Sequence, residues 1–339
     1  MTGELARFGA QTKHGAEQAV ADINAHWGVL GRQIRLVVGD DRCDPKRAPD
    51  TARDLADQHV VFVAGHFCSG ASIRASRVYH ESGILQITPA SSNPRLTDEA
   101  AATGWTNVFC LYVRDDEEGS IAGAWIAGNT KGRNVTIVDD RSGLGRLVAG
   151  AAQQAMNRSG LRETLRHSYS PKAYGAAGDL VGKLKSAKIS ILYFGGSAAA
   201  VAEIVREARD IKLALQLVAS DMLNSPEFAA AGAGGGGAMF VADADSPDYS
   251  SARTVVAELQ KASMEPESYV LNNYAAVELW AEAAAKAGTT EANKVAQILR
   301  DGSWNTILGT VTFDAKGDVI KPNTGWYVYR NGSFSQVKM

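Results

Sequence analysis

The sequence predicts an α/β protein built on doubly wound parallel sheets. Short apolar segments rich in β-branched residues alternate with amphipathic helical segments, and the loops between them are short. Strict alternation of this kind is typical of parallel strands joined by helical crossovers. A length of 339 residues favours two domains.

The first two thirds of the chain keep this alternation without a break. We expect helices over residues 11–26, 45–58, 71–83, 117–128, 146–159, 180–187 and 198–210, and a loop or short helix over 94–106. We expect strands over residues 34–41, 60–65, 84–88, 108–116, 134–140, 165–169, 189–196 and 215–221. The helical periodicity is clear in the first helix, where Ala16, Val20 and Ile23 share one face.

The pattern changes after Gly237. A strand over 238–244 is followed by expected helices over 249–262, 269–286 and 290–299. Two extended pieces around a turn follow at 309–318, and a hairpin with Asn331-Gly332 as its turn ends the chain. Helices followed by antiparallel strands are expected where a chain crosses back to complete an earlier domain.

Composition excludes several classes of function. The net charge is −2, whereas a nucleic-acid surface needs a basic stripe. No run of about 18 apolar residues is present, which argues against a transmembrane helix. The sequence has no CxxC, HExxH or Cys/His cluster, and its Gly234–Gly237 run lacks a GxGxxG context. We therefore expect neither a metal site nor a nucleotide cofactor.

The segment 60–93 carries the strongest functional signal. Its two strands end in the hydroxyl-rich loops GHFCSG and PASSNP, which should lie side by side at the carboxyl edge of a parallel sheet. Ser69, Ser91 and Ser92, with the free N–H groups of a helix start, would suit a small carboxylate. The alternatives are that Ser69 is a helix N-cap and that Ser91 and Ser92 are turn residues.

The three cysteines allow two interpretations. Cys43 and Cys68 could form a disulfide, which would indicate an oxidising compartment. Equally, Cys43, Cys68 and Cys110 could be unrelated buried thiols, and the residues alone leave both possibilities open.

Seven motifs in order connect the chain to a known family. They are GDDRCDP, VAGHFCSGAS, ILQITPASSNP, VRDDEEG, YFGG, YAAVELWAEA and GTVTFDAKGD. Together they resemble the Leu/Ile/Val-binding proteins, which are type I periplasmic solute-binding proteins of ABC importers. The resemblance implies two α/β lobes joined by three crossovers, with lobe 1 at 1–116 plus 242–320 and lobe 2 at 117–241 plus 321–339. It places the ligand in a cleft between the lobes.

The resemblance also bears on the start of the chain and on its cysteines. The family has a signal peptide and a central strand before the position that matches Met1, and neither is visible here. We therefore expect lobe 1 to lack its first strand. The resemblance pairs Cys43 with Cys68 as the family's disulfide.

Matched one by one, five positions fall on the family's ligand shelf and its acidic partner. Ser69 matches the serine that holds the ligand carboxylate through its hydroxyl and N–H, and Ala90 offers its carbonyl to the ammonium. Ser92, preceded by Ser91, matches a threonine that touches both charged groups. Asp221 matches the acid that pairs with the ammonium.

The remaining matches concern the ligand side chain. Phe8 matches an aromatic residue at the mouth of lobe 1, and Tyr112 stands in a strand that departs from the family pattern. Leu144 and Ser197 replace aromatic residues that the family usually carries on lobe 2. These replacements leave room for a larger or flatter ligand, such as an aromatic acid.

The resemblance thus implies a monomeric, non-enzymatic, periplasmic receptor that delivers a small amino acid or related carboxylate to a membrane permease. One alternative is a ligand sensor of the same fold. Another is a hydrolase built on Ser69, His66 and Asp41, which the absence of a GxSxG elbow opposes.

Overall fold

The computed structural model describes residues 2–3, 5–130, 132–230, 237–244 and 250–338, and it divides the chain into two compact units. Unit 1 comprises Met1–Arg114 and Asp245–Pro322, and unit 2 comprises Asp115–Ala244 and Asn323–Met339. The chain passes between the units three times. These boundaries lie two or three residues from those expected for the two lobes.

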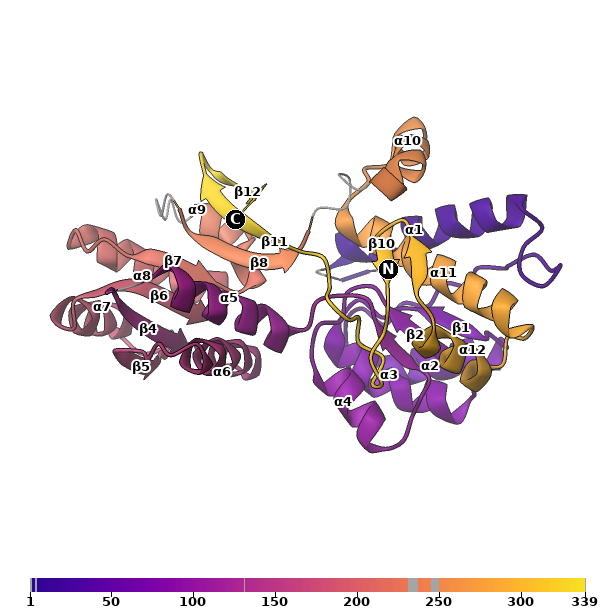
Figure 1. Cartoon of the computed structure of the whole chain (residues 1–339), viewed down its shortest axis with the longest axis horizontal. Helices are drawn as coiled ribbons and strands as arrows, with labels where there is room; N and C mark the ends of the chain where they lie inside the picture. The colour runs from indigo at the N-terminus through magenta and orange to yellow at the C-terminus, as the bar shows by residue number, and fades with distance from the viewer. Residues whose placement is uncertain (1, 4, 131, 231–236, 245–249, 339) are drawn as a thin grey trace. The chain divides into compact units, whose positions relative to one another are not determined.

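Unit 1 is built on a three-stranded parallel sheet in the order β1-β2-β3, of which Figure 1 labels β1 and β2. Its strands are β1 (Phe62–Ala64), β2 (Leu85–Thr88) and β3 (Val108–Cys110), with a small antiparallel pair, β9 (Trp304–Thr306) and β10 (Gly309–Val311). Its helices are α1 (Ala6–Ala25), α2 (Ala48–Asp57), α3 (Ser69–Glu81), α4 (Arg95–Ala102), η3 (Ser250–Ala252), α10 (Arg253–Lys261), α11 (Ser268–Ala287) and α12 (Ala292–Asp301).

Close packing of α1 on α11 organises the main core of unit 1. A Cβ atom added at Gly15 of α1 would lie 2.0 Å from the carbonyl oxygen of Val270, so only glycine allows this approach. The apolar face of α11 joins buried side chains of β2 and β3 in one cluster. The core therefore holds the strand ends, and the loops that follow them, in fixed positions.

The prediction of a strand over residues 34–41 is wrong. The segment has no assigned secondary structure, no described strand pairs with it, and β1 forms its ladder with β2 alone. A β-branched sequence favours extended backbone, whereas a strand also requires a hydrogen-bonded neighbour. Segment 34–41 has no such neighbour among the described residues.

Unit 2 is built on a seven-stranded sheet in the order β12-β11-β8-β7-β6-β4-β5 (Figure 1). The strands β4 (Asn134–Asp139), β5 (Leu165–Ser168), β6 (Ile189–Gly195), β7 (Gln216–Ala219) and β8 (Met239–Asp243) are parallel. The terminal hairpin, β11 (Thr324–Arg330) and β12 (Ser333–Val337), adds to β8 in the antiparallel sense. The helices are α5 (Asp115–Asn129), α6 (Gly143–Arg158), α7 (Ala176–Ser186), α8 (Ala198–Asp210), η1 (Asp221–Leu223) and α9 (Pro226–Ala230).

Most predicted elements are confirmed within a few residues, with a few exceptions. The predicted strand 108–116 ends at Cys110, and Asp115 already begins α5, where four acidic residues favour a helix start. Strand β9 was not predicted, because its three residues carry no alternating pattern of useful length. The hairpin turn is confirmed, with positive φ angles of 52° at Asn331 and 90° at Gly332. Tyr249, the first residue of a predicted helix, and Gly234–Gly236 of the glycine run lie outside the described residues.

Candidate functional site

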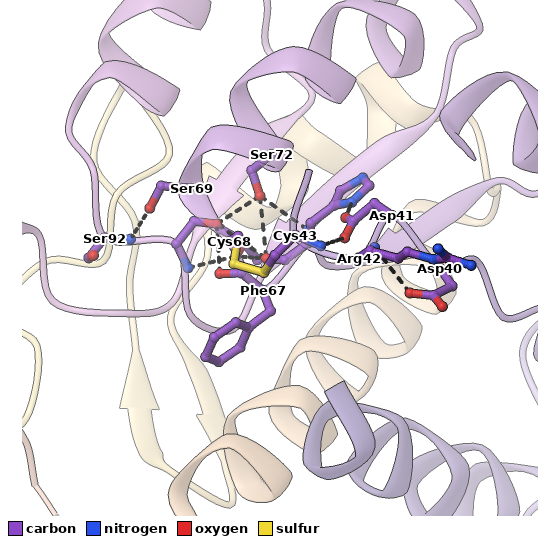
Figure 2. Close-up of a disulfide and its surroundings, with 12 residues drawn as sticks. Asp40, Asp41, Arg42, Cys43, Phe67, Cys68, Ser69, Ser72 and Ser92 are labelled. Atoms are coloured by element: carbon purple, nitrogen blue, oxygen red, sulfur yellow. Dashed lines mark hydrogen bonds and ion pairs between the residues drawn. A yellow bond between two sulfur atoms is a disulfide. The ribbon is translucent and has the colours of Figure 1, made fainter. Parts of the chain in front are cut away.

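The loops after β1 and β2 lie side by side at the carboxyl edge of the unit 1 sheet, as the sequence predicts. The Oγ atom of Ser69 accepts hydrogen bonds from the backbone N–H groups of Ser92, at 3.2 Å, and Asn93, at 3.3 Å (Figure 2). Ser69 is not the helix N-cap, because Cys68 occupies that position without a side-chain capping bond. The Ser69 hydroxyl therefore joins the two loops.

In the loop after β2, Ala90, Ser91 and Ser92 differ in whether their hydrogen-bonding groups remain available to a ligand. The Ser91 hydroxyl is buried and bonds to Ser72 Oγ at 2.7 Å and to the His66 carbonyl at 3.2 Å, which favours a structural role. By contrast, the Ser92 hydroxyl and the Ala90 carbonyl make no hydrogen bond to any residue that the structure describes. The loop therefore presents one hydroxyl and one carbonyl for a ligand.

Helix α3 contributes backbone donors to the same place. The N–H group of Ser69, at the helix start, has no described acceptor, whereas that of Ala71 donates to the Cys68 carbonyl at 2.9 Å. A helix N-terminus favours an anion both by these donors and by its dipole. The arrangement suits a carboxylate near Ser69 and Ser92.

Four aromatic rings gather beside this shelf within unit 1. Phe8 stacks on Phe67 with ring centroids 5.2 Å apart, and Tyr269 meets the Phe67 ring edge-on at 4.9 Å. Tyr112, which is buried, lies 5.9 Å from Tyr269. Phe8 and Tyr112 were predicted, whereas Phe67 and Tyr269 were missed. A loop aromatic two residues before Ser69 was a usable signal for Phe67, but nothing local places Tyr269 here.

The loop after β1 is tied to the segment 34–43 by two links. Cys43 and Cys68 form a disulfide, with Cα atoms 5.4 Å apart, as the resemblance implied (Figure 2). His66 bonds through Nδ1 to Asp41, and its Nε2 lies 2.7 Å from the Tyr79 hydroxyl. Both ring nitrogens of His66 are thus engaged in structural contacts.

Unit 2 places a group of acids at the carboxyl edge of its own sheet. Asp221 follows β7, and its backbone N–H donates to Glu118 Oε1 at 2.8 Å from the first turn of α5. Tyr193 on β6 packs in one cluster with Ala122, one turn after Glu118, and the Tyr193 hydroxyl is buried without a described partner. Glu118 and Tyr193 were missed by the sequence interpretation.

Burial and mutual repulsion raise the pKa values of Asp221 and Glu118, so both favour the protonated form. Burial, followed by the charge of Asp115, raises the pKa of Asp221 from 3.8 to about 7. Burial, then Asp221 and Asp115, raises the pKa of Glu118 well above its ordinary value. A positively charged group placed among them would reverse both shifts.

Leu144 and Ser197, which stand where the family usually carries aromatic residues, both lie at the start of a helix. Ser197 is the N-cap of α8, its Oγ accepting from the N–H of Ala200, while its own N–H donates to Asp140 Oδ2 at 2.9 Å. Leu144 is the second residue of α6 and is half-buried. Both follow strands at the same sheet edge as Asp221.

Among the described residues, no group of three His, Cys, Asp or Glu side chains is arranged to hold a metal ion. No described helix combines the length and the apolar character needed to cross a membrane.

Comparison with known proteins agrees with this architecture. The sequence profile of a family described as "Periplasmic binding protein" matches residues 1–333. Leu/Ile/Val-binding protein homolog 1 of Brucella abortus is 34% identical over 337 residues, which cover 98% of this chain and 89% of that protein. An amino acid binding protein of Pseudomonas aeruginosa is 34% identical over 324 residues, covering 94% and 85%.

Among solved structures, an ABC transporter substrate-binding protein of Desulfitobacterium hafniense in complex with Leu has a TM-score of 0.81 and 26% identity. The match covers 96% of this chain and 95% of that one. The chain therefore belongs to the periplasmic binding protein family, among the relatives of the Leu/Ile/Val-binding proteins.

Proposed function

We propose that this protein captures a small amino acid with an apolar side chain and delivers it to the membrane permease of an ABC importer. The observation that carries the proposal is that each unit has one polar site, and that the two sites suit ligand groups of opposite charge. Unit 1 presents uncommitted donors at Ser69 and Ser92, and unit 2 presents carboxylates at Asp221 and Glu118. An α-amino acid carries one charge of each sign.

One ligand held by both units explains why the receptor would close. The carboxylate is assigned to the hydroxyl of Ser92 and the N–H of Ser69, and the ammonium to the Ala90 carbonyl and Asp221. Charge-assisted hydrogen bonds of this kind contribute roughly 1.5–3 kcal/mol each. A ligand that gains both sets only when the units approach shifts the population toward the closed state.

The aromatic residues beside the shelf are assigned to the ligand side chain. Phe8, Phe67 and Tyr269 are only partly buried, so their rings offer apolar surface close to Ser69. Leu144 and Ser197 line the unit 2 side in this proposal and leave the side-chain pocket open to larger residues. Ser91 is assigned a structural role, because its buried hydroxyl bonds to Ser72 and to the His66 carbonyl.

We propose a binding role without catalysis. In a hydrolase built on Ser69, a base would have to take the proton of its hydroxyl. His66 instead bonds to Asp41 and Tyr79, and Ser69 Oγ accepts from two backbone N–H groups. The disulfide suits the oxidising periplasm in which this family works, and we propose that the receptor acts there as a monomer.

A thermal-shift screen over amino acids, aromatic acids and amides tests this function, with calorimetry on the compounds that raise the melting temperature. We expect apolar amino acids to bind and to remain chemically unchanged by NMR after prolonged incubation. A preference for benzoate over every amino acid, or turnover of an ester or amide, would contradict the proposal.

A further inference from the structure

The carboxylate of Asp140 joins the two loops of unit 2 that carry Leu144 and Ser197. Asp140 follows β4, and its Oδ1 accepts a hydrogen bond from the N–H of Ser142 at 3.0 Å. Its Oδ2 accepts from the N–H of Ser197 at 2.9 Å, across 57 residues of sequence. Ser142 and Ser197 are the N-caps of α6 and α8. One carboxylate therefore lies at the start of two helices.

This carboxylate is the counter-charge of those two helix ends. The N-terminus of a helix carries a partial positive charge and attracts anions, yet neither α6 nor α8 has an acid in its own first turn. Asp140 forms no ion pair with any residue that the structure describes, whereas Asp139 pairs with Nη2 of Arg166 at 2.6 Å. The charge of Asp140 is therefore balanced by the two helix ends and not by a cation.

Three glycines give the carboxylate a shaped place. A Cβ atom added at Gly145 would lie 2.3 Å from Asp140 Oδ1, and one added at Gly196 would lie 2.3 Å from Asp140 Cγ. A Cβ atom added at Gly195 would lie 2.4 Å from the carbonyl oxygen of Gly145. The backbone of both loops thus approaches the carboxylate as closely as glycine allows, and the side chain of Asp140 fills the space between them.

Unit 1 differs from unit 2 in this respect. Helix α3 also lacks an acid in its first turn, and its N-cap, Cys68, makes no side-chain capping bond. No carboxylate of a described residue accepts from the N–H of Ser69. The N-terminus of α3 is therefore available to an anion from outside the chain, whereas α6 and α8 share an anion that belongs to the chain.

We propose that Asp140 is a positioning residue, a built-in anion that occupies the anion site of unit 2 and thereby directs the solute carboxylate to unit 1. A second carboxylate near Asp140 would be repelled by its charge and would find the N–H groups of Ser142 and Ser197 already used. An ammonium would be attracted by the same charge. The inference rests on the proposed amino-acid function, and it names the residue that sets which end of the solute each unit receives.

The anion site is tested by thermal unfolding of Asp140→Ala with sodium formate, whose two oxygens can replace those of the lost carboxylate. Without formate, the melting temperature should fall by several degrees. Formate should restore at least half of this loss, whereas formamide, a neutral molecule of similar shape, should restore none at equal concentration and ionic strength. An equal response to formate and formamide, or an equal response to formate in the wild type and in Asp140→Asn, would overturn the proposal.

The orienting role is tested by calorimetry with leucine and with 4-methylpentanoate, the same acid without its amine. Asp140→Asn keeps the size of the side chain but removes its charge, so the ammonium of leucine loses an attraction and a carboxylate near unit 2 loses a repulsion. The preference for leucine over 4-methylpentanoate should therefore fall at least fivefold relative to the wild type. A purely structural role would weaken both compounds equally and leave this ratio unchanged, and that result would overturn the proposal.

The two measurements also separate this inference from the proposed function. Failure of the wild type to bind leucine, while formate still restores Asp140→Ala, would contradict the proposed function and with it the orienting role. The same result would leave Asp140 as the resident anion of unit 2.

Discussion

The Oγ atom of Ser69 lies 3.2 Å from the backbone nitrogen of Ser92, and this bond joins the first turn of α3 to the loop after β2. Ser69 therefore has two roles. Its hydroxyl fixes the shape of the shelf, and its own N–H, at the start of α3, remains available to a ligand. The two residues can be separated by mutation, because Ser92 takes part in the bond through its backbone and not through its hydroxyl.

Ser69→Ala should weaken both folding and binding. It leaves the N–H groups of Ser92 and Asn93 without their acceptor, which should cost about 1–2 kcal/mol of unfolding free energy in urea titrations. Calorimetry should show at least a tenfold loss of amino-acid affinity. In Ser92→Ala the loop bond remains, so stability should change by less than about 0.5 kcal/mol while affinity still falls. Equal stability of the two variants would count against this role of Ser69.

Amino-acid affinity should rise with pH between about 6 and 8. The pKa of ligand-free Asp221 is about 7, so below that pH binding of the ammonium requires Asp221 to lose a proton, which reduces the net binding free energy. Calorimetry at pH 6 and pH 8 should differ by roughly tenfold, with proton release seen in buffers of different ionisation enthalpy. Asp221→Asn should bind weakly at both pH values. A pH-independent affinity in the wild type would exclude Asp221 as the partner of the ammonium.

The ligand-free protein should gain less stability from Asp221 as pH rises. A carboxyl whose pKa is raised on folding, from 3.8 to about 7, binds more protons in the folded state across that interval, so its contribution to unfolding free energy falls from pH 4 to pH 7. Asp221→Asn should therefore be stabilising relative to wild type at pH 7.5, by on the order of 1–3 kcal/mol, and nearly neutral at pH 4. Glu118→Gln should change stability in the same direction. Denaturant titrations that show a larger gain at pH 4 would reverse the assigned sign.

Reduction of the disulfide should destabilise unit 1. Cys43 and Cys68 are 25 residues apart, and closing a loop of that length is worth about 3.5 kcal/mol in the chain-entropy model. Dithiothreitol should therefore lower the melting temperature of the wild type and of Cys110→Ser, which keeps the pair, but leave Cys43→Ser/Cys68→Ser unchanged. The reductant would have no effect on any of them if the two thiols were not joined in the purified protein.

Features that depend on local sequence pattern could be predicted, whereas those that depend on a contact with a residue distant in sequence could not. Alternation of short strands and helices was enough to predict the fold class, and the small-residue loops at 65–70 and 89–94 were enough to place Ser69 beside Ser92. Segment 34–41 has strand composition but no strand, because ladder formation depends on a neighbour that composition does not reveal.

The same reason explains the residues that were missed. Tyr269 joins Phe67 across some 200 residues of sequence, and no local signal connects them. Glu118 sits in an acidic helix start that looks like an ordinary dipole-stabilising turn, and only the position of β7 brings Asp221 to it. In the first case the packing of α11, and in the second the order of the strands, brings together residues of the proposed site.

The central claim, that one ligand's carboxylate and ammonium are both recognised, is tested most directly by calorimetry with three matched compounds. These are leucine, 4-methylpentanoate, which lacks the amine, and leucinamide, which lacks the carboxylate. We predict that leucine binds and that removal of either charged group weakens binding at least tenfold. Binding of 4-methylpentanoate as tight as that of leucine would contradict the account, because the acids of unit 2 would then have no part in recognition.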